Sequence, residues 1–245
     1  KAVRVLAQMI KCGCKPNSQL CNALIDGFVQ ASKMKDALKL LHKMNSINCS
    51  PNIVTYNTII DGLCKGERFA EAYELVKEML EKGWKPDMIT YSLLMRGLCQ
   101  GYKINLALNL WSQVVSKGLT PDVTMHNIMI HGLCLAGKID VALHLYLNMS
   151  QLNCVPNLVT HNSLMEGFYK ARDCKNALVI WARILRGWLQ PDIISYNITL
   201  KGLCSCNRMS YAMSFLNDAL SKKIVPTIIT WNILVRAVLI ERAST

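Results

Sequence analysis

Small polar residues recur at two fixed positions of a 35-residue period, and their side chains could hydrogen-bond the edges of nucleic-acid bases. The first column lies on an otherwise apolar helical stretch: Asn22, Asn57, Ser92, Asn127, Asn162, Asn197 and Asn232. The second column follows a proline: Asn52, Asp87, Asp122, Asn157, Asp192 and Thr227. Amide, hydroxyl and carboxylate groups supply the donors and acceptors that a base edge requires. Helix capping is the alternative, but we expect it to explain neither the second column nor its independent variation.

The prolines set the repeat. All seven share one phase: Pro16, Pro51, Pro86, Pro121, Pro156, Pro191 and Pro226. A fixed period of about 20–50 residues predicts a stacked array of small units. Counting from the residue after each proline-polar pair gives six complete repeats: 18–52, 53–87, 88–122, 123–157, 158–192 and 193–227. Residues 1–17 are the C-terminal half of a truncated repeat, and residues 228–245 are the first helix of another.

Each repeat is predicted to be a helix-turn-helix. In residues 53–87, Gly62 marks a close helix approach, Ala72 a close helix crossing, and Gly83 with Pro86 the end of the second helix. The predicted N-caps of the first helices are Thr55, Thr90, Thr160, Ser195 and Thr230. One aromatic-like column is expected to pack in the core: Cys21, Tyr56, Tyr91, His126, His161, Tyr196 and Trp231.

Composition restricts the function classes. The net charge of +12 favours an acidic partner such as nucleic acid, although a generic basic surface is the plainer alternative. No apolar run reaches the roughly 18 residues of a membrane helix, so we expect no membrane partner. The chain begins within a repeat, so any targeting peptide is expected to lie outside it.

Neither a metal site nor a catalytic site is expected. The eleven cysteines include no C-x-x-C pair, and Cys64, Cys99, Cys134 and Cys204 share one repeat phase. Such cysteines are expected to be small buried side chains in a reducing compartment. Only two of the five histidines share a phase, and no nucleotide-binding glycine loop is present. We therefore predict no cofactor and no enzyme activity.

The stretch VTYNTIIDGLCKGERFAEAYELVKEML at 54–80, in repeats that close with K-G-x-x-P-D, resembles the pentatricopeptide repeat family. The uniform length resembles the P-type subclass, whose members are organellar RNA-binding proteins of plants. Tetratricopeptide repeats have a period of about 34 residues and a W-x₂-L-G-x₂-Y signature that is missing here. The resemblance implies an all-α fold, a right-handed α-solenoid superhelix of 35-residue helix-turn-helix repeats.

The resemblance also implies a site. Single-stranded RNA would lie along the first helices, one base per repeat, selected by the fifth and last residues that form the two polar columns above. The second residues would clamp the bases, with core packing as the alternative: Gln19, Val54, Ile89, Thr124, Val159, Ile194 and Ile229. Gln19 and Thr124 depart from the branched apolar pattern. Candidate phosphate contacts are Lys65, Lys170, Lys33, Arg68, Lys103, Lys138 and Arg208, although a solvated turn explains any one of them equally well.

By resemblance to the family's code, Asn with Asp selects U, Asn with Asn selects C or U, and Ser with Asp selects G. The predicted core is 5′-(C/U)UG(C/U)U(pyrimidine)-3′. We predict a role in organellar RNA stabilisation, processing, splicing or translation, in mitochondria or alternatively chloroplasts, with other organellar RNA-processing proteins as further partners. The competing functions are a protein–protein interaction scaffold and an enzyme whose catalytic domain lies outside this chain.

Overall fold

The structure is a computed structural model that describes residues 8–9, 11–187 and 189–244. The described residues form helices and no strand, which confirms the predicted all-α class. The first helices of the repeats are α2 (Ser18–Gln30), α4 (Ile53–Lys65), α6 (Met88–Gln100), α8 (Val123–Leu135), α10 (Leu158–Lys170), α12 (Ile193–Ser205) and α14 (Ile228–Ser244). The second helices are α3 (Met34–Met44), α5 (Phe69–Glu81), α7 (Ile104–Ser116), α9 (Ile139–Met149), α11 (Cys174–Arg186) and α13 (Met209–Ser221). Two short 3₁₀ turns, η1 (Asn45–Ile47) and η2 (Ser150–Leu152), follow α3 and α9.

The first helices are capped by the residue after the proline, and not by the hydroxyl residue that the sequence suggested. Oδ1 of Asn52 accepts a hydrogen bond from the backbone N–H of Thr55 at 3.0 Å. The Thr55 hydroxyl accepts the backbone N–H of Asn52 at 3.0 Å, which completes a capping box. Asn52 has an extended backbone, from which its short side chain reaches the third helical N–H. The prediction of N-caps at Thr55, Thr90, Thr160, Ser195 and Thr230 is therefore wrong by three residues.

The second helix of the clearest repeat ends as predicted. Lys82 is the C-cap of α5, Gly83 follows with φ of 83°, and Pro86 lies beyond. Glycine adopts this left-handed conformation without a steric penalty, and the proline cannot continue a helix. The chain then turns back to begin α6 at the next repeat.

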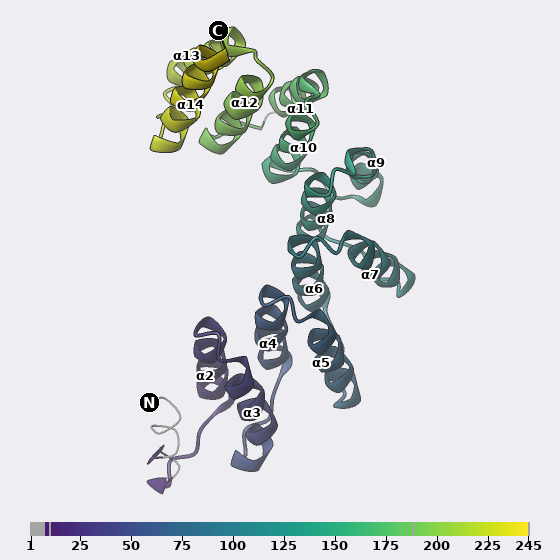
Figure 1. Cartoon of the computed structure of the whole chain (residues 1–245). Helices are drawn as coiled ribbons and strands as arrows, with labels where there is room; N and C mark the ends of the chain where they lie inside the picture. Colours follow the sequence, from purple (N-terminus) through teal and green to yellow (C-terminus); the bar gives the residue numbers. More distant parts are fainter. Residues whose placement is uncertain (1–7, 10, 188, 245) are drawn as a thin grey trace. The chain divides into compact units, whose positions relative to one another are not determined.

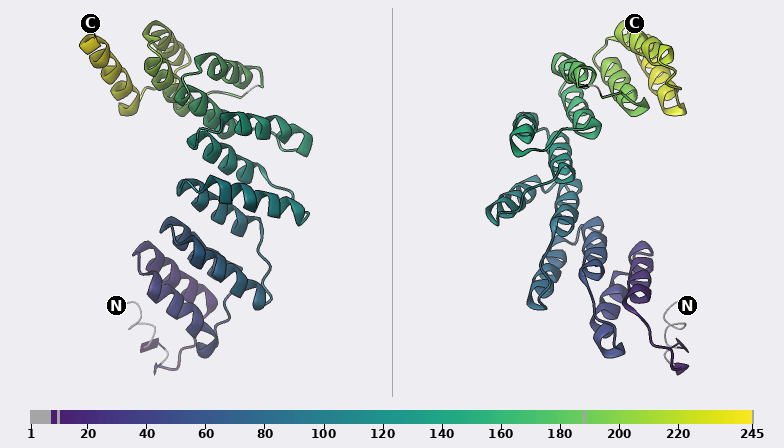
Figure 2. Two further views of the ribbon diagram at one scale, coloured as in Figure 1. Left: turned by 45° about the vertical axis from the view of Figure 1, so that its right-hand side comes forward. Right: turned by 180° about the vertical axis from the view of Figure 1, so that it is seen from behind.

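The first structural unit comprises Lys1–Leu119, of which residues 1–7 and 10 lie outside the described part. Its helices α2, α4 and α6 pack against one another in chain order, and α3, α5 and α7 each pack on their own first helix. Figure 1 shows the second helices on one side of the first helices, and Figure 2 shows this arrangement from two further directions. A unit of stacked helical hairpins is the arrangement expected of a solenoid.

The second unit, Thr120–Thr245, repeats this plan. Helices α8, α10, α12 and α14 pack successively, while α9, α11 and α13 pack on α8, α10 and α12. The alanine column that predicted a close helix crossing has no solvent exposure in either unit: Ala37, Ala72, Ala107, Ala142, Ala177 and Ala212.

Two columns that the sequence showed separately meet between adjacent first helices. A methyl group on Gly97 of α6 would lie 2.5 Å from Cβ of Cys64 of α4, and one on Gly167 of α10 would lie 2.7 Å from Sγ of Cys134 of α8. Gly202 likewise lies directly over the ring of Tyr169. The glycine of one repeat thus accommodates the residue two places further along the helix in the preceding repeat. The predicted close approach is confirmed.

One cysteine pairing has no counterpart in the repeat. Cys174, the first residue of α11, forms a disulfide with Cys206, which follows α12. The expectation of thiols in a reducing compartment did not include this bond. Among the described residues, no helix is long and apolar enough to cross a membrane.

Candidate nucleic-acid interface

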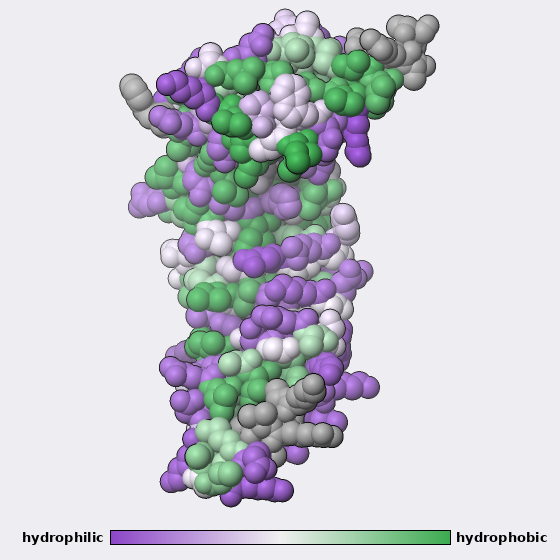
Figure 3. Space-filling model, turned by 90° about the vertical axis from the view of Figure 1, so that its left-hand side faces the viewer, coloured by the Kyte–Doolittle hydropathy of each residue, from purple (hydrophilic) through white to green (hydrophobic). Residues whose placement is uncertain are grey.

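A column of apolar side chains is exposed at the start of the first helices. Val54, Ile89, Val159, Ile194 and Ile229 expose between 54 and 62% of their surface, although each precedes a buried residue. Gln19 and Thr124, at the same position, are also exposed. Core packing, the alternative explanation for these residues, is therefore excluded. In the first unit they belong to the row of first helices that faces the viewer in Figure 3, where apolar patches alternate with polar bands.

The fifth residue of each repeat lies one turn further into the same helix and is largely buried. Asn57, Ser92 and Asn162 expose no more than 9% of their surface, while Asn22, Asn127 and Asn197 are half-buried. Asn232, in the last first helix, is exposed. A buried amide needs hydrogen-bond partners, and its partners decide which of its atoms remains available to a ligand.

In the first unit, the amide of the fifth residue is held by the next repeat. The Thr90 hydroxyl donates to Oδ1 of Asn57 at 2.7 Å, and the Thr55 hydroxyl donates to Oδ1 of Asn22 at 2.6 Å. Nδ2 of Asn22 in turn donates to Oδ1 of Asn52 at 3.4 Å. The fifth residue, the closing residue of the same repeat and the third residue of the following repeat thus form one polar cluster.

The second unit contains the same cluster twice. The Thr160 hydroxyl donates to Oδ1 of Asn127 at 2.6 Å, and the Thr230 hydroxyl donates to Oδ1 of Asn197 at 2.7 Å. One repeat differs, because Oδ1 of Asn162 is buried without a hydrogen-bond partner. Sequence reasoning missed this contact because it assigned the threonines to capping. The 33-residue spacing from each asparagine to the next threonine was the available signal.

The closing residue of each repeat has a structural task. Asn52, Asp87, Asp122, Asn157 and Asp192 all use Oδ1 to accept the third backbone N–H of the next first helix. The argument that capping could not account for these residues was therefore wrong. Capping occupies one oxygen, however, and leaves the second atom of the side chain, Oδ2 of aspartate or Nδ2 of asparagine, for another partner.

The candidate phosphate contacts lie at the opposite end of the first helices. Lys65 is at the C-terminus of α4, so it is about 17 Å along the axis from Val54 at a rise of about 1.5 Å per residue. Lys65 also pairs with Asp61 at 2.5 Å, and Lys170 with Glu166 at 3.0 Å. The residues that precede the second helices are Lys33, Arg68, Lys103, Lys138 and Arg208. The structure does not bring these seven residues together with the polar clusters.

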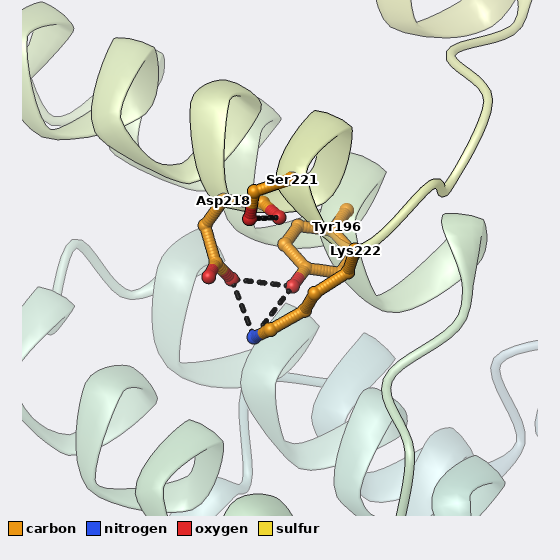
Figure 4. A network of polar contacts seen from close by, with 4 residues as sticks. All are labelled: Tyr196, Asp218, Ser221 and Lys222. Carbon is orange, nitrogen blue, oxygen red and sulfur yellow. Dashed lines mark hydrogen bonds and ion pairs between the residues drawn. The ribbon is translucent and has the colours of Figure 1, made fainter.

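The fourth residues of the repeats form the core beneath this surface, as predicted, except for the exposed Trp231. Figure 4 shows one of them, Tyr196, whose hydroxyl donates to Asp218 at 2.5 Å and accepts from Lys222 at 3.2 Å. Burial raises the pKa of Tyr196, and the hydrogen bond to Asp218 raises it further. The phenol therefore stays protonated near neutral pH and is neither a base nor a nucleophile in this setting.

Three of the four phased cysteines have unreactive thiols. Burial raises the pKa of Cys64, Cys99 and Cys134 to about 12 in each case, so these thiols remain protonated. Metal ligation and nucleophilic attack both require the thiolate. The described residues contain no group of three or more histidine, cysteine or acidic side chains arranged to hold a metal ion.

Family models match most of the chain. The PPR repeat family matches residues 16–65, 51–100, 121–170 and 191–239, and the PPR repeat matches residues 89–119 and 159–187. None of the curated proteins compared with the chain matches it.

Two groups of solved structures are similar in fold. The crystal structure of the pentatricopeptide repeat protein PPR10 in complex with an 18-nt psaJ RNA element matches 96% of this chain, with a TM-score of 0.63 and 22% identity. The PPR domain of Arabidopsis thaliana protein-only RNase P 1 in complex with tRNA matches 76% of this chain and 97% of that domain, with a TM-score of 0.58 and 14% identity. The chain covers 40% of the PPR10 chain.

Proposed function

The chain belongs to the pentatricopeptide repeat family, and from this premise we propose that it binds single-stranded RNA, one base per repeat. The observation that carries the proposal is the exposed apolar column beside the buried polar clusters. A branched side chain at each repeat offers a surface against the face of a base. The polar cluster beside it offers hydrogen bonds to the base edge. The structures of PPR10 with RNA and of the RNase P domain with tRNA support RNA as the partner.

The capping geometry supports a chemical basis for base choice. With Oδ1 committed to the helix, Asp87 and Asp192 offer a second oxygen, which is an acceptor. Asn52 and Asn157 offer an amide nitrogen, which is a donor. Uracil carries a donor at N3 and cytosine an acceptor there. Aspartate at the closing position therefore favours U and asparagine favours C.

The proposed target is 5′-(C/U)UG(C/U)U(pyrimidine)-3′, read from the N-terminal to the C-terminal repeat. The chain acts by occupancy: it holds its RNA single-stranded and excludes other factors. We propose that it works without catalysis of its own in RNA stabilisation, processing, splicing or translation. The proposed location is the mitochondrion, with the chloroplast as the alternative, alongside other organellar RNA-processing proteins.

Binding of the purified chain to this six-base RNA, to poly(A) and to duplex RNA tests the proposal. Single-stranded target should bind most tightly, and affinity should fall as salt rises, because the chain carries a net charge of +12. Equal affinity for the target and poly(A) would refute sequence-specific reading.

A matched pair of variants tests the exposed column itself. Ile89→Ser removes an exposed apolar side chain of the column, and Leu80→Ser removes one of 48% exposure from the second helix α5. Ile89→Ser should weaken RNA binding by about three- to tenfold, the effect of losing roughly 1 kcal/mol of apolar contact. Leu80→Ser should leave RNA binding unchanged. Equal effects of the two substitutions would show that the column does not contact RNA.

A further inference from the structure

The threonine at the third position of the following repeat is the one member of the polar cluster that has no assigned part in base reading. Its hydroxyl has a single hydrogen. At Thr90, the oxygen accepts the backbone N–H of Asp87 at 3.3 Å, while the hydrogen points to Oδ1 of Asn57 at 2.7 Å and to Oδ1 of Asp87 at 2.9 Å. The shorter distance is the one to Asn57.

We propose that this threonine is a positioning residue for specificity: it holds the base-reading amide with its oxygen inward and its NH₂ group toward the base. The inference rests on the function proposed above. An asparagine side chain can rotate by half a turn and exchange its donor and its acceptor. The threonine bond removes this freedom by occupying Oδ1. The repeat then presents a donor and selects a base edge that offers a carbonyl oxygen, such as that of U, over one that offers an amino group, such as that of A.

The repeat of Asn162 shows what happens without this bond. Ser195 occupies the threonine position there, and its hydroxyl donates to Oδ1 of its own cap Asp192 at 2.9 Å. Oδ1 of Asn162 is left buried with no partner. Serine lacks the γ-methyl group that restricts χ1 of threonine, so its hydroxyl can turn to the cap alone. No hydrogen bond to Oδ1 fixes the orientation of the Asn162 amide.

The sequence of the remaining repeat agrees with this role. Ser92 is the one fifth residue that is not asparagine, and the third residue of the following repeat, Met125, has no hydroxyl. Leu20 is the other third residue without a hydroxyl, and it follows residues 1–17, which contain no fifth residue to orient. A serine hydroxyl rotates freely and has no amide orientation to fix. The hydroxyl at the third position is thus present wherever an asparagine of the preceding repeat needs orienting.

Three variants of the full chain test the proposal by their preference for U over A at one base. Thr90→Val keeps the shape of the side chain and removes the hydroxyl, and it should reduce the preference at the second base by about three- to tenfold. Ser195→Thr supplies the missing donor to Asn162 and should raise the preference at the fifth base by a similar factor. Ser195→Ala removes the hydroxyl bond to Oδ1 of Asp192 but retains the backbone N–H bond that holds the same oxygen, and it gives Asn162 no donor, so it should leave that preference unchanged.

The preference ratio separates positioning from folding. A general loss of helix stability in Thr90→Val would lower the affinity for every RNA equally and would leave the ratio unaltered. Thr90 also donates to Asp87, so a second background is needed to isolate its effect on the Asn57 amide. In an Asn57→Ala background, Thr90→Val should have no further effect on the ratio, because the amide that it orients is gone.

The outcomes are distinct. A wild-type chain that does not discriminate at the second base refutes the proposed function itself. If the wild type discriminates, an unchanged ratio in Thr90→Val, or a uniform loss across RNAs, overturns the positioning role and leaves the proposed function standing. If Thr90→Val fails to fold, Ser195→Thr decides: a sharper fifth-base preference supports the role, and an unchanged one overturns it.

Discussion

Replacing Gly97 by alanine tests whether the first helices approach as closely as the structure has them. The added methyl group would lie 2.5 Å from Cβ of Cys64 and 3.1 Å from its Sγ. Ordinary contacts between carbon atoms are about 3.5–4.0 Å long. Helices α4 and α6 would therefore have to separate by roughly 1 Å, and overpacking of this kind costs about 1–3 kcal/mol.

Gly27 provides the matched control. It occupies the same repeat position on α2, but a methyl group there would meet nothing within 4 Å. Alanine in place of glycine within a helix gains about 0.5–1 kcal/mol, and this gain applies to both substitutions. Gly27→Ala should therefore stabilise the chain slightly. Gly97→Ala should destabilise it, with a difference between the two variants of about 1–3 kcal/mol.

Urea unfolding followed by circular dichroism measures this difference. Repeat arrays can depart from two-state behaviour. The urea concentrations at which unfolding begins and is complete should therefore be compared along with the midpoint. Alkylation of Cys64 provides a local readout, because burial raises the pKa of this thiol to about 12 and separation of the helices would expose it. Equal shifts for the two variants, with Cys64 still protected, would refute the close approach of α4 and α6.

Three further predictions concern specificity and pH. Ser92→Asn should change the third base from G to U, in binding assays with two RNAs that differ only there, by about 5- to 150-fold in relative affinity. Asp87→Asn should preserve the helix cap, since the two residues cap equally well, while changing the second base from U to C; a large loss of thermal stability would contradict the capping geometry. His161 accepts a hydrogen bond from the Tyr146 hydroxyl and is buried, and burial lowers its pKa below 6.5. Stability should be complete above that pH and fall as pH decreases through it, and His161→Tyr should remove this loss in melts between neutral pH and about pH 5.

The period alone predicts the helices and the small residues between them. Proline cannot continue a helix and glycine ends one readily, so Gly83 and Pro86 identify the end of α5 from sequence. A recurrent glycine within a helix has a propensity cost, and so the sequence also indicated close packing at Gly97. Local chemistry determines these features, which is why one sequence suffices to find them.

Features that depend on two repeats at once could not be predicted in the same way. The sequence showed Gly97 and Cys64 as members of separate columns, and only the stacking of α6 on α4 joins them. The exposure of Ile89 depends on which face of the helix the neighbouring repeat covers. The disulfide between Cys174 and Cys206 links residues at unrelated repeat positions. In each case the missing information was the register of one hairpin on the next.

Thr55 shows why the caps were misplaced and what the correct assignment implies. Both Asn52 and Thr55 are good capping residues, and the box uses both, so composition alone does not decide which of them precedes the helix. The structure gives the cap to Asn52, whose second side-chain atom remains available. Under the proposed function, such a side chain holds its helix through one atom and reads a base through the other, so its position is fixed while its chemistry varies. We therefore propose that exchange between aspartate and asparagine alters base choice at little cost in stability, which would let one scaffold address many RNA sequences.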